Sequence, residues 1–535
     1  MNYNPLDYRY PSQRTVVYGT KGMVATSQPL AAQAGLDILK RGGNAVDAAI
    51  ATAACLTVVE PTSNGIGGDA FAIVWMNNKL YGLNASGGAP QGISIDILKN
   101  KGINEIPKFG WTPVTVPGVP AAWGALSEAF GKLPLKEVLT PAITYAYEGY
   151  PVSPITGQYW CRAFEIYEKN LKGEEFTEWF KVFAPLGRAP KIGELWRSNG
   201  HGKTLEAIAE TGGRDFYSGD LAQRIHNYSK STGGYIEKSD LEAFKVQWVD
   251  PVKVNYRGYD VWELPPNGQG IVALMALNIL KGFEFKDKES VDTYHKQIEA
   301  IKLAFADGQK YITDPKKMKV RVDDLLSDAY GEERRKLIGE NAALPEAGEP
   351  ARGGTVYLAT ADGEGNMVSY IQSNYMGFGS GVVIPETGIS LQNRGHNFSL
   401  NPLDHNCLEP GKRTYHTIIP GFLTKDQHAV GPFGVMGGFM QPQGHLQIIM
   451  NTIDFNMNPQ TALDASRWCW TKEKSVEMEN LISEDIFKSL QQKGHNLVRS
   501  QDVGILGRGQ IIWRNSDGIL AGGTEGRTDG AVATW

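Results

Sequence analysis

The run from Ala45 to Thr57 restricts the fold of this chain more than any other stretch of its sequence. Its side chains are almost all apolar, with Asp47 as the one charge, so a helix formed here has almost no polar face to expose to water. Asn44 is a suitable N-cap for that helix, and Gly42-Gly43 ends an earlier helix that begins near Pro29. The sequence therefore predicts a helical hairpin that lies deep in a large core.

The composition fits a soluble globular protein and argues against two classes of partner. Of the 535 residues, 41% are hydrophobic and 21% are charged, which is enough apolar material for a sizeable core. The net charge of −5 is opposite in sign to that of a typical nucleic-acid-binding domain. The longest apolar stretch, Ala48–Val59, is well short of the roughly 20 residues that span a bilayer. We expect neither nucleic acid nor a membrane as a partner.

The cysteines and the N-terminal residues indicate the compartment. Cys55, Cys161, Cys407 and Cys469 are far apart and form no C-x-x-C pair, which fits a reducing environment better than a disulfide framework. The opening sequence MNYNPLDYRYPSQR contains no apolar core of a signal peptide. These features predict a cytoplasmic protein.

A change of character near residue 354 divides the chain. Glu340–Gly354 (ENAALPEAGEPARGG) has no periodic pattern and is rich in Gly, Ala and Pro, so we expect an exposed linker. Thr355–Ala361 then alternates like a strand, Asp362–Gly365 forms a turn and Met367–Ser373 returns, which predicts a hairpin. Later strand-like runs cover Gly381–Ile384, His416–Phe422 and Gly509–Trp513. The residues alone support a mixed α/β fold.

Thr355 stands where the linker meets the first strand of the hairpin, and its chemistry depends on that position. A Thr hydroxyl becomes a good nucleophile when a base lies beside it, and the α-amine of a chain that begins with Thr can be that base. Thr355 reaches this state only if the bond from Gly354 is cut, and the Gly353-Gly354 sequence gives the backbone freedom to distort there. Locally, an ordinary edge-strand Thr after a loop explains the same pattern.

Two glycine clusters allow both a functional and a structural interpretation. Gly437 and Gly438 could present adjacent backbone N–H groups to a developing oxyanion, or they could form a tight turn between sheets. The loop with Gly65, Gly67 and Gly68 lacks the Lys-Ser/Thr that follows in a phosphate-binding loop. Packing of this loop against the Ala-rich helix is the better interpretation.

Five of the nine histidines fall in one stretch, which raises the alternative of a metal site. His396, His405, His416, His428 and His445 show neither the i, i+4 helix spacing nor the H-x-E setting of zinc enzymes. We therefore expect loop and surface histidines, with a metal-dependent amidohydrolase as a rival interpretation.

Several segments, taken in order, resemble the γ-glutamyltransferase (glutathione hydrolase) family of N-terminal-nucleophile hydrolases. They are GGNAVDAAIATAACLTVVEPTSNGIGGDAF (Gly42–Phe71), VPGVPAAWGAL (Val116–Leu126), FYSGDLAQRI (Phe216–Ile225), NYRGYDVWELPPNGQG (Asn255–Gly270), the hairpin at Thr355 and a C-terminal DGAVA. The resemblance extends from about Val24 to Trp535. It implies a four-layer α-β-β-α sandwich.

The resemblance also implies a proenzyme that cuts itself before a nucleophilic Thr. Thr355 matches that nucleophile, and the cleavage site is the bond between Gly354 and Thr355. Residues 1–354 would become a large chain and residues 355–535 a small chain, which stay together as one interleaved unit. Whether that unit forms a homodimer is left open.

Three further residues receive catalytic roles from the resemblance. Ser373 matches a hydroxyl that supports the nucleophile, and Gly437 and Gly438 match the glycines of an oxyanion hole. The implied reaction requires no metal and no organic cofactor.

The substrate pocket departs from the family pattern at three places. Ser86 stands where transferases carry the Arg that binds the α-carboxylate of a γ-glutamyl group, and Asn397 stands where an acidic residue pairs with the α-amine. His416-Thr417 replaces a Ser-Ser pair that contacts the carboxylate. Because an unpaired ammonium–carboxylate head group is costly to desolvate, the pocket fits a glutaryl-type acyl group better.

These departures, together with SNYMGFGSGV (Ser373–Val382), resemble a subgroup called γ-glutamyltransferase-like proteins or cephalosporin acylases. Tyr375 in this motif is a further substrate-binding candidate, and Arg394 or Arg413 would hold the distal carboxylate of a diacid amide. The short loop Leu400–Gly411 should admit bulky leaving groups. We expect acyl transfer from γ-glutamyl or glutaryl-type amides, with a self-cleaving protein that only binds an amide ligand as a second rival.

Overall fold

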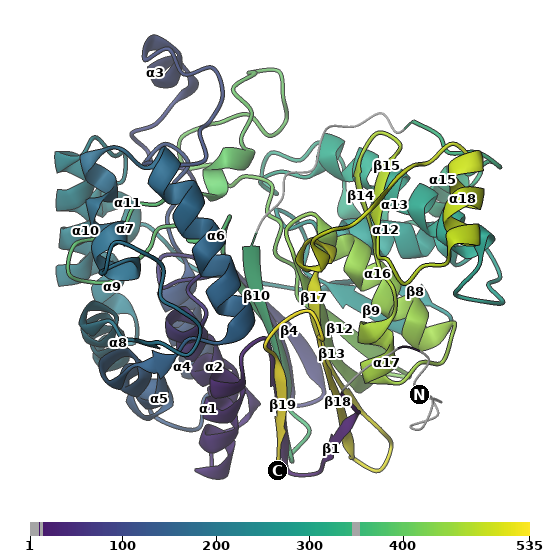
Figure 1. Cartoon of the computed structure of the whole chain (residues 1–535), viewed down its shortest axis with the longest axis horizontal. Coiled ribbons are helices and arrows are strands. Elements are labelled where there is room, and N and C mark those ends of the chain that lie inside the picture. Colours follow the sequence, from purple (N-terminus) through teal and green to yellow (C-terminus); the bar gives the residue numbers. More distant parts are fainter. Residues whose placement is uncertain (1–9, 11–13, 345–353) are drawn as a thin grey trace.

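Two seven-stranded antiparallel sheets, stacked face to face, form the centre of the molecule (Figure 1). The computed structural model describes Tyr10 and residues 14–344 and 354–535. The first sheet contains, in order across it, β1 (Val17–Gly19), β18 (Leu520–Thr524), β17 (Arg508–Arg514), β13 (His428–Met436), β12 (Gly421–Lys425), β9 (Tyr259–Glu263) and β8 (Val252–Tyr256). The second contains β19 (Ala531–Thr534), β2 (Gly22–Thr26), β10 (Gly354–Asp362), β11 (Met367–Tyr375), β3 (Asp69–Met76), β4 (Lys79–Ala85) and β7 (Gln247–Val249).

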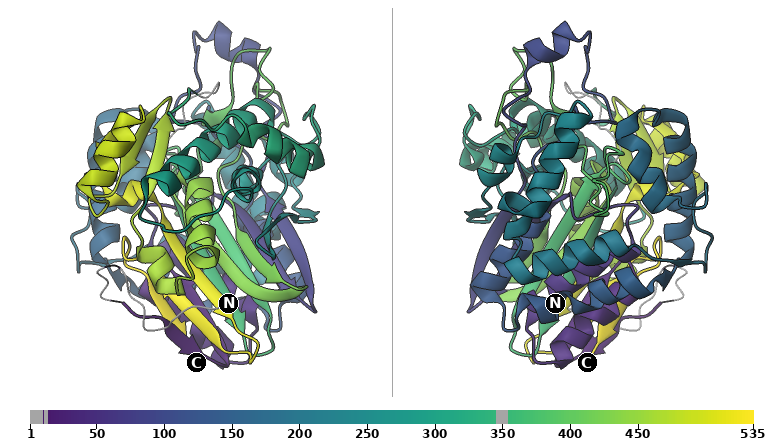
Figure 2. Two further views of the ribbon diagram at one scale, coloured as in Figure 1. Left: turned by 90° about the vertical axis from the view of Figure 1, so that its right-hand side faces the viewer. Right: turned by 90° about the vertical axis from the view of Figure 1, so that its left-hand side faces the viewer.

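Helices cover the outer face of each sheet and complete the four-layer α-β-β-α sandwich that the resemblance implied (Figure 2). The second sheet is covered by α1 (Pro29–Lys40), α2 (Ala45–Val59) and α4 (Val119–Phe130), with α5 (Leu135–Glu148) packed against α2 and α8 (Asn199–Thr211) against α5. The first sheet is covered by α12 (Gly270–Leu280), α16 (Met440–Ile453) and α17 (Pro459–Asp464), with α13 (Val291–Tyr311) packed against α12. A separate apolar cluster with Ile73, Tyr357 and Phe422 fills the space between the sheets.

Smaller elements surround the sandwich. They are α3 (Ile95–Asn100), β5 (Tyr150–Pro151), α6 (Pro154–Asn170), η1 (Glu174–Phe176), α7 (Thr177–Phe183), β6 (Leu195–Trp196), α9 (Arg214–Ser218), α10 (Asp220–Ser231), α11 (Lys238–Glu242), α14 (Val322–Leu325), α15 (Asp328–Arg335), η2 (Arg394–Asn397), β14 (Trp468–Lys472), β15 (Ser475–Met478), α18 (Glu484–Gln492), β16 (Asn496–Arg499) and η3 (Val503–Leu506).

The predicted helical hairpin is confirmed as α1 and α2. Every residue of α2 is buried, and the Asn44 side chain accepts from the backbone N–H of Asp47 while the Asp47 carboxylate accepts from that of Asn44. The two helices approach closely at Gly35, where a Cβ would lie 2.2 Å from Thr52 Oγ1. Small residues on both helices therefore allow α2 to lie between α1, α5 and the second sheet.

The predicted hairpin after the linker is also confirmed, as β10 and β11. β10 lies in the middle of the second sheet, between β2 and β11, so Thr355 is not on an edge strand. Residues 345–353 of the predicted linker lie outside the described residues. The linker's first part, residues 340–344, has no helix or strand.

Of the three later strand predictions, the first was wrong and the second was right only in its last two residues. Gly381–Ile384 contributes only an isolated bridge between Val383 and Ser390, and β12 begins at Gly421 rather than at His416. In the first of these runs the backbone bonds to neighbouring loop residues, as in Ile384 N–H to Ile389 O at 2.9 Å. Burial on all sides gave residues 381–384 and 416–420 an apolar pattern without a sheet. Gly509–Trp513 lies within β17, as predicted.

No helix in the described part of the chain is long and apolar enough to cross a membrane. All four cysteines are free, and Cys55 is buried in α2. The cytoplasmic location stays a prediction.

Candidate active site

Thr355 lies at the start of a central strand, beside a second hydroxyl. Its Oγ1 is 3.0 Å from Ser373 Oγ, and both residues are buried. The pairing of β10 with β11 is irregular between Gly354 and Val356, a bulge that sets Thr355 apart from the regular ladder. In the uncut precursor, the nitrogen of Thr355 belongs to the peptide bond from Gly354.

Tyr375 ends β11 in a conformation that serves this hydroxyl pair. Its φ of +75° is in the left-handed region, which is unusual for a non-glycine residue. In this conformation its N–H donates to Ser373 Oγ at 2.7 Å, and its phenol donates to Asn397 Oδ1 at 2.7 Å. Burial raises the pKa of Tyr375 to about 12, so the phenol stays a donor.

Gly437 and Gly438 follow β13 and precede α16. Their φ angles of +140° and +62° are values that side chains disfavour, which explains two successive glycines. Gln269 Nε2 donates to the carbonyl oxygens of Gly438, at 2.9 Å, and of Thr417, at 2.7 Å. The carbonyls are thereby fixed from one side.

A chain of contacts joins this glycine turn to the hydroxyl pair. Thr417 Oγ1 accepts from Arg394 Nη1 at 2.6 Å, and the guanidinium of Arg394 stacks on the Tyr375 ring at 4.1 Å. Tyr375 in turn bonds to Ser373. The structure therefore brings Thr355, Ser373, Tyr375, Arg394, Thr417 and Gly438 into one connected network.

Arg394 is the most unusual member of this network. It is only 1% exposed, and burial lowers its pKa to about 10. Its Nε and Nη2 have no hydrogen-bond partner among the described residues, although buried guanidinium donors are normally satisfied. Two unpaired donors on one planar fork suit a carboxylate ligand.

A buried acid–imidazole pair lies beside the hydroxyls. Asp69, opposite Ser373 at the start of β3, is 3.0 Å from His416 Nε2, and both are 1% exposed or less. Ile418 N–H donates to His416 Nδ1, so the ring proton is on Nε2 and is donated to Asp69. Burial holds the pKa of His416 well below its usual value. Burial also raises the pKa of Asp69 to about 7, although the nearby charge of Arg394 acts to lower it.

Several side chains that were predicted to bind substrate form hydrogen bonds to other groups of the protein. The Ser86 hydroxyl donates to Asn84 Oδ1 at 2.7 Å, and Ser86 O accepts from Arg413 Nε at 2.7 Å. Asn397 accepts from Tyr375 and donates to Tyr415 O at 3.0 Å. His416 is bound to Asp69. Of these four residues, Arg413 lines one of the cavities described below, and direct contact of any of them with substrate stays a prediction.

Two cavities adjoin these residues. One of about 410 Å³ begins at Gly437 and Met376 and continues along α6. The other, of about 450 Å³, is bordered by Arg413 and by Glu409–Gly411 of the loop predicted to leave the site open. That loop therefore borders the second cavity and does not line the first.

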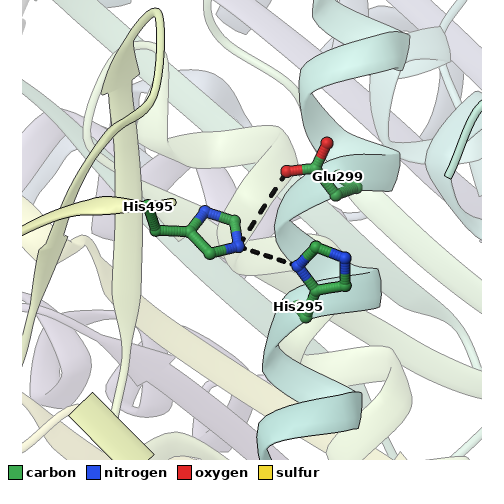
Figure 3. Close-up of side chains that lie close together, drawn as sticks. All are labelled: His295, Glu299 and His495. Atoms are coloured by element: carbon green, nitrogen blue, oxygen red, sulfur yellow. Dashed lines mark hydrogen bonds and ion pairs between the residues drawn. The ribbon is translucent and has the colours of Figure 1, made fainter. Parts of the chain in front are cut away.

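The histidine stretch does not assemble into a cluster. His396 bonds to Ile106 O, His405 to Ile312 O and His445 to Glu263, each in a separate place. Among the described residues, one group of three could hold a metal ion, namely His295, Glu299 and His495 (Figure 3). None of the five predicted histidines belongs to it.

Each member of this group has contacts within the protein, although His495 Nδ1 has no hydrogen-bond partner among the described residues. His295 and Glu299 lie one turn apart on α13 and face His495 (Figure 3). His295 Nε2 donates to Gly339 O at 2.8 Å, so its Nδ1 accepts from His495 Nε2 at 2.8 Å. Glu299 Oε1 is 2.5 Å from the ammonium of Lys302, which balances its charge.

Sequence reasoning missed Asp69 and Arg508. An acidic residue at the first position of a wholly buried strand was a visible signal for Asp69. Arg508 lines the first cavity, but a single Arg at the start of a strand carries no recognisable pattern.

A buried threonine that begins a central strand, in two stacked sheets enclosed by helices, defines the class of N-terminal-nucleophile hydrolases. The family model described as gamma-glutamyltranspeptidase matches residues 31–535. The chain therefore belongs to the γ-glutamyltransferase family, in which relatives are made as proenzymes.

Three members of the comparison are similar to this chain over nearly its whole length. A cephalosporin acylase from Bacillus halodurans, known from its crystal structure, is 61% identical, with a TM-score of 0.96 over 100% of this chain and 99% of that one. The glutathione hydrolase-like YwrD proenzyme of Bacillus subtilis is 39% identical over 96% of this chain and 99% of its own. The oxamate amidohydrolase proenzyme of Klebsiella pneumoniae is 33% identical over 96% and 98%.

Proposed function

We propose that the chain is the precursor of an N-terminal Thr amidase that acts on monoamides of simple diacids, with Thr355 as nucleophile and Arg394 as the carboxylate-binding residue. The unpaired donors of buried Arg394 carry this proposal. The γ-glutamyl amides handled by other family members are the alternative substrates.

Self-cleavage would come first and create the catalytic base. Thr355 Oγ attacks the carbonyl carbon of Gly354, the C–N bond breaks, and the acyl group moves to oxygen as an ester while the nitrogen gains a proton. Water then hydrolyses the ester and separates residues 1–354 from residues 355–535. The Ser373 hydroxyl, 3.0 Å away, can orient Thr355 Oγ by a hydrogen bond during these steps, while the Oγ proton goes to the nitrogen of Thr355.

Turnover would repeat the chemistry on a substrate amide. The free amine of Thr355 accepts the Oγ proton as Oγ attacks the amide carbonyl. The N–H groups of Gly437 and Gly438 would stabilise the oxyanion. The C–N bond breaks as the amine returns the proton to the leaving nitrogen, and water releases the acid.

The charges around the acyl position favour a single carboxylate over a zwitterion. Arg394 offers two donors, whereas Asn397 stands where an acid would pair with an α-amine and already uses both ends of its amide. Arg413 is a weaker candidate because its Nε is bound to Ser86 O. One relative supports this choice, because the Klebsiella pneumoniae protein is an oxamate amidohydrolase and oxamate is itself the monoamide of a short diacid.

The test compares kcat/KM for glutaryl and γ-glutamyl p-nitroanilides on the same processed protein. We expect glutaryl to be preferred. Arg394→Gln should lower kcat/KM for the glutaryl compound about ten- to hundredfold, the usual effect of losing hydrogen bonds to a charge.

Arg413→Gln is the matched control and should have a smaller effect. Melting temperature and self-cleavage would show whether each variant folds. A strong preference for the γ-glutamyl compound, unaffected by Arg394→Gln, would show that the acyl site has been misassigned.

A further inference from the structure

The cavity of about 410 Å³ extends to Gly437 of the proposed oxyanion hole. Gly437, Met376 and Asn393 line this cavity. Arg394 itself does not, although Asn393 precedes it in the chain. Suppose that Arg394 binds the carboxylate of the substrate's acyl group and that the scissile carbonyl lies at Gly437. The amine portion of the substrate then extends into this cavity. The walls include Tyr159, Ile166 and Tyr167 of α6, Phe109 and Trp470, and the volume suits a body of one or two rings.

One charged side chain in this apolar wall is buried and incompletely paired. Arg508 is the first residue of β17 and pairs across the sheet with Met436, the residue before Gly437. It is 6% exposed, and its Nε has no hydrogen-bond partner among the described residues. Its guanidinium stacks on the Tyr159 ring at 4.8 Å, which fixes the plane of the fork at the cavity wall.

The acid nearest to Arg508 does not satisfy it. Glu60 Oε1 is 3.6 Å from Arg508 Nη1, beyond hydrogen-bond distance, while Glu60 Oε2 accepts from the Ser27 hydroxyl. Burial also raises the pKa of Glu60 to about 7, so its negative charge is only partly developed near neutral pH.

The charges that line the cavity have a positive excess. Lys108, Arg162 and Arg508 are the basic residues, and Asp502 is the acidic one. Asp502 is already paired with Arg162. An anionic group in the cavity would therefore meet Arg508 and Lys108 without a competing carboxylate from the wall.

We propose that this cavity is the amine-side subsite, that it accepts leaving amines with an apolar or aromatic body bearing a carboxylate, and that Arg508 binds this carboxylate. The proposal rests on the proposed function, because Thr355 and Arg394 set which side of the substrate is the amine side. Arg508 thereby becomes a specificity-determining residue separate from the acyl site.

The experiment uses two glutaryl anilides that differ in one group. The first is glutaryl p-nitroaniline, and the second carries one carboxylate on the nitroaniline ring. We expect the wild-type protein to prefer the carboxylated compound in kcat/KM, and Arg508→Gln to reduce that preference about ten- to hundredfold. Arg508→Lys keeps the charge beside Glu60 and should retain part of the preference.

The double variant Arg162→Gln/Asp502→Asn is the matched control, because it removes a guanidinium from the same wall together with the carboxylate paired to it. Arg162 also lies near Tyr159, at 5.7 Å, but its side chain is 57% exposed and paired with Asp502, so the preference should persist. Self-cleavage and melting temperature report on folding, and Arg508→Lys replaces Arg508→Gln if the latter is unstable.

The outcomes separate this inference from the proposed function. If both anilides are turned over with a ratio that Arg508→Gln and Arg508→Lys leave unchanged, the Arg508 subsite is wrong and the amidase assignment stands. If neither is turned over, the amidase assignment fails on these substrates. Equilibrium binding of the two free nitroanilines to wild-type and variant protein then tests whether Arg508 binds the carboxylate. Equal affinities of the wild-type protein for the two nitroanilines would overturn the inference.

Discussion

The contact between Thr355 Oγ1 and Ser373 Oγ places a second hydroxyl beside the bond that would be cut. Ser373 is fixed in turn by the N–H of Tyr375, whose left-handed backbone turns that donor toward it. A single oxygen, that of Thr355, would serve both self-cleavage and turnover. The two reactions should therefore respond together to changes at this residue.

Thr355→Ala should abolish self-cleavage and amide turnover, because both need the hydroxyl as nucleophile. Thr355→Ser keeps a hydroxyl and should retain part of each, and a time course by denaturing gel with a parallel anilide assay measures both. Thr360→Ser, on the same strand, is the matched control, because the Thr360 hydroxyl bonds to Ala45 O and should not affect cleavage. Normal processing of Thr355→Ala would place the nucleophile elsewhere.

Residues within one motif could be predicted from the sequence, whereas residues defined by distant contacts could not. Thr355 and Ser373 belong to one hairpin, so their proximity follows from its register. Asp69 and His416 are 347 positions apart and meet only in the folded chain. The unpaired donors of Arg394 likewise follow from how Thr417 and Tyr375 surround it.

At the scale of the elements, side chains of α13 form hydrogen bonds to the segment that directly precedes residues 345–353. Lys302 Nζ donates to Ala343 O at 2.6 Å, and Glu299 Oε2 accepts from Ala343 N–H at 3.1 Å. His295 adds its bond to Gly339 O. The buried ion pair between Glu299 and Lys302 thus fixes the chain shortly before the proposed cleavage site.

Lys302→Met should destabilise the protein by about 3–5 kcal/mol, because it leaves the buried Glu299 carboxylate without its partner. Self-cleavage should also slow, since Ala343 loses a bond. The double variant Lys302→Met/Glu299→Gln should recover much of the loss, and denaturant unfolding measures all of them. Lys310→Met, exposed on the same helix, is the control. Equal stability of Lys302→Met and wild type would contradict this account of the pair.

Element prediction succeeded where a pattern had one structural solution. The wholly apolar α2 could only be buried, and the alternation of β10 and β11 about a Gly-rich turn could only be a hairpin. Residues 381–384 and 416–420 are buried among loops, so their apolar patterns resembled strands without any sheet to join. The hydrophobic pattern of a sequence indicates which residues are buried. In these segments the buried residues do not pair with a neighbouring strand.

At the scale of the whole molecule, the two proposed chains share both sheets. β10 and β11 of residues 355–535 lie between β2 and β3 of residues 1–354, and β12 pairs with β9 in the other sheet. Separating the chains would expose the apolar layer between the sheets. Cleavage should therefore leave one particle, which gel filtration under native conditions would show.

Denaturing mass spectrometry of the purified, active protein tests the central claim most directly. The account predicts two masses, those of residues 1–354 and of residues 355–535, and a small chain whose N-terminal sequence is Thr355-Val356-Tyr357. The Thr355→Ala protein should show only the full mass of 58.6 kDa. An active wild-type protein that consists solely of the 58.6 kDa chain, or a cut at any other bond, would contradict the assignment of Thr355 as the N-terminal nucleophile.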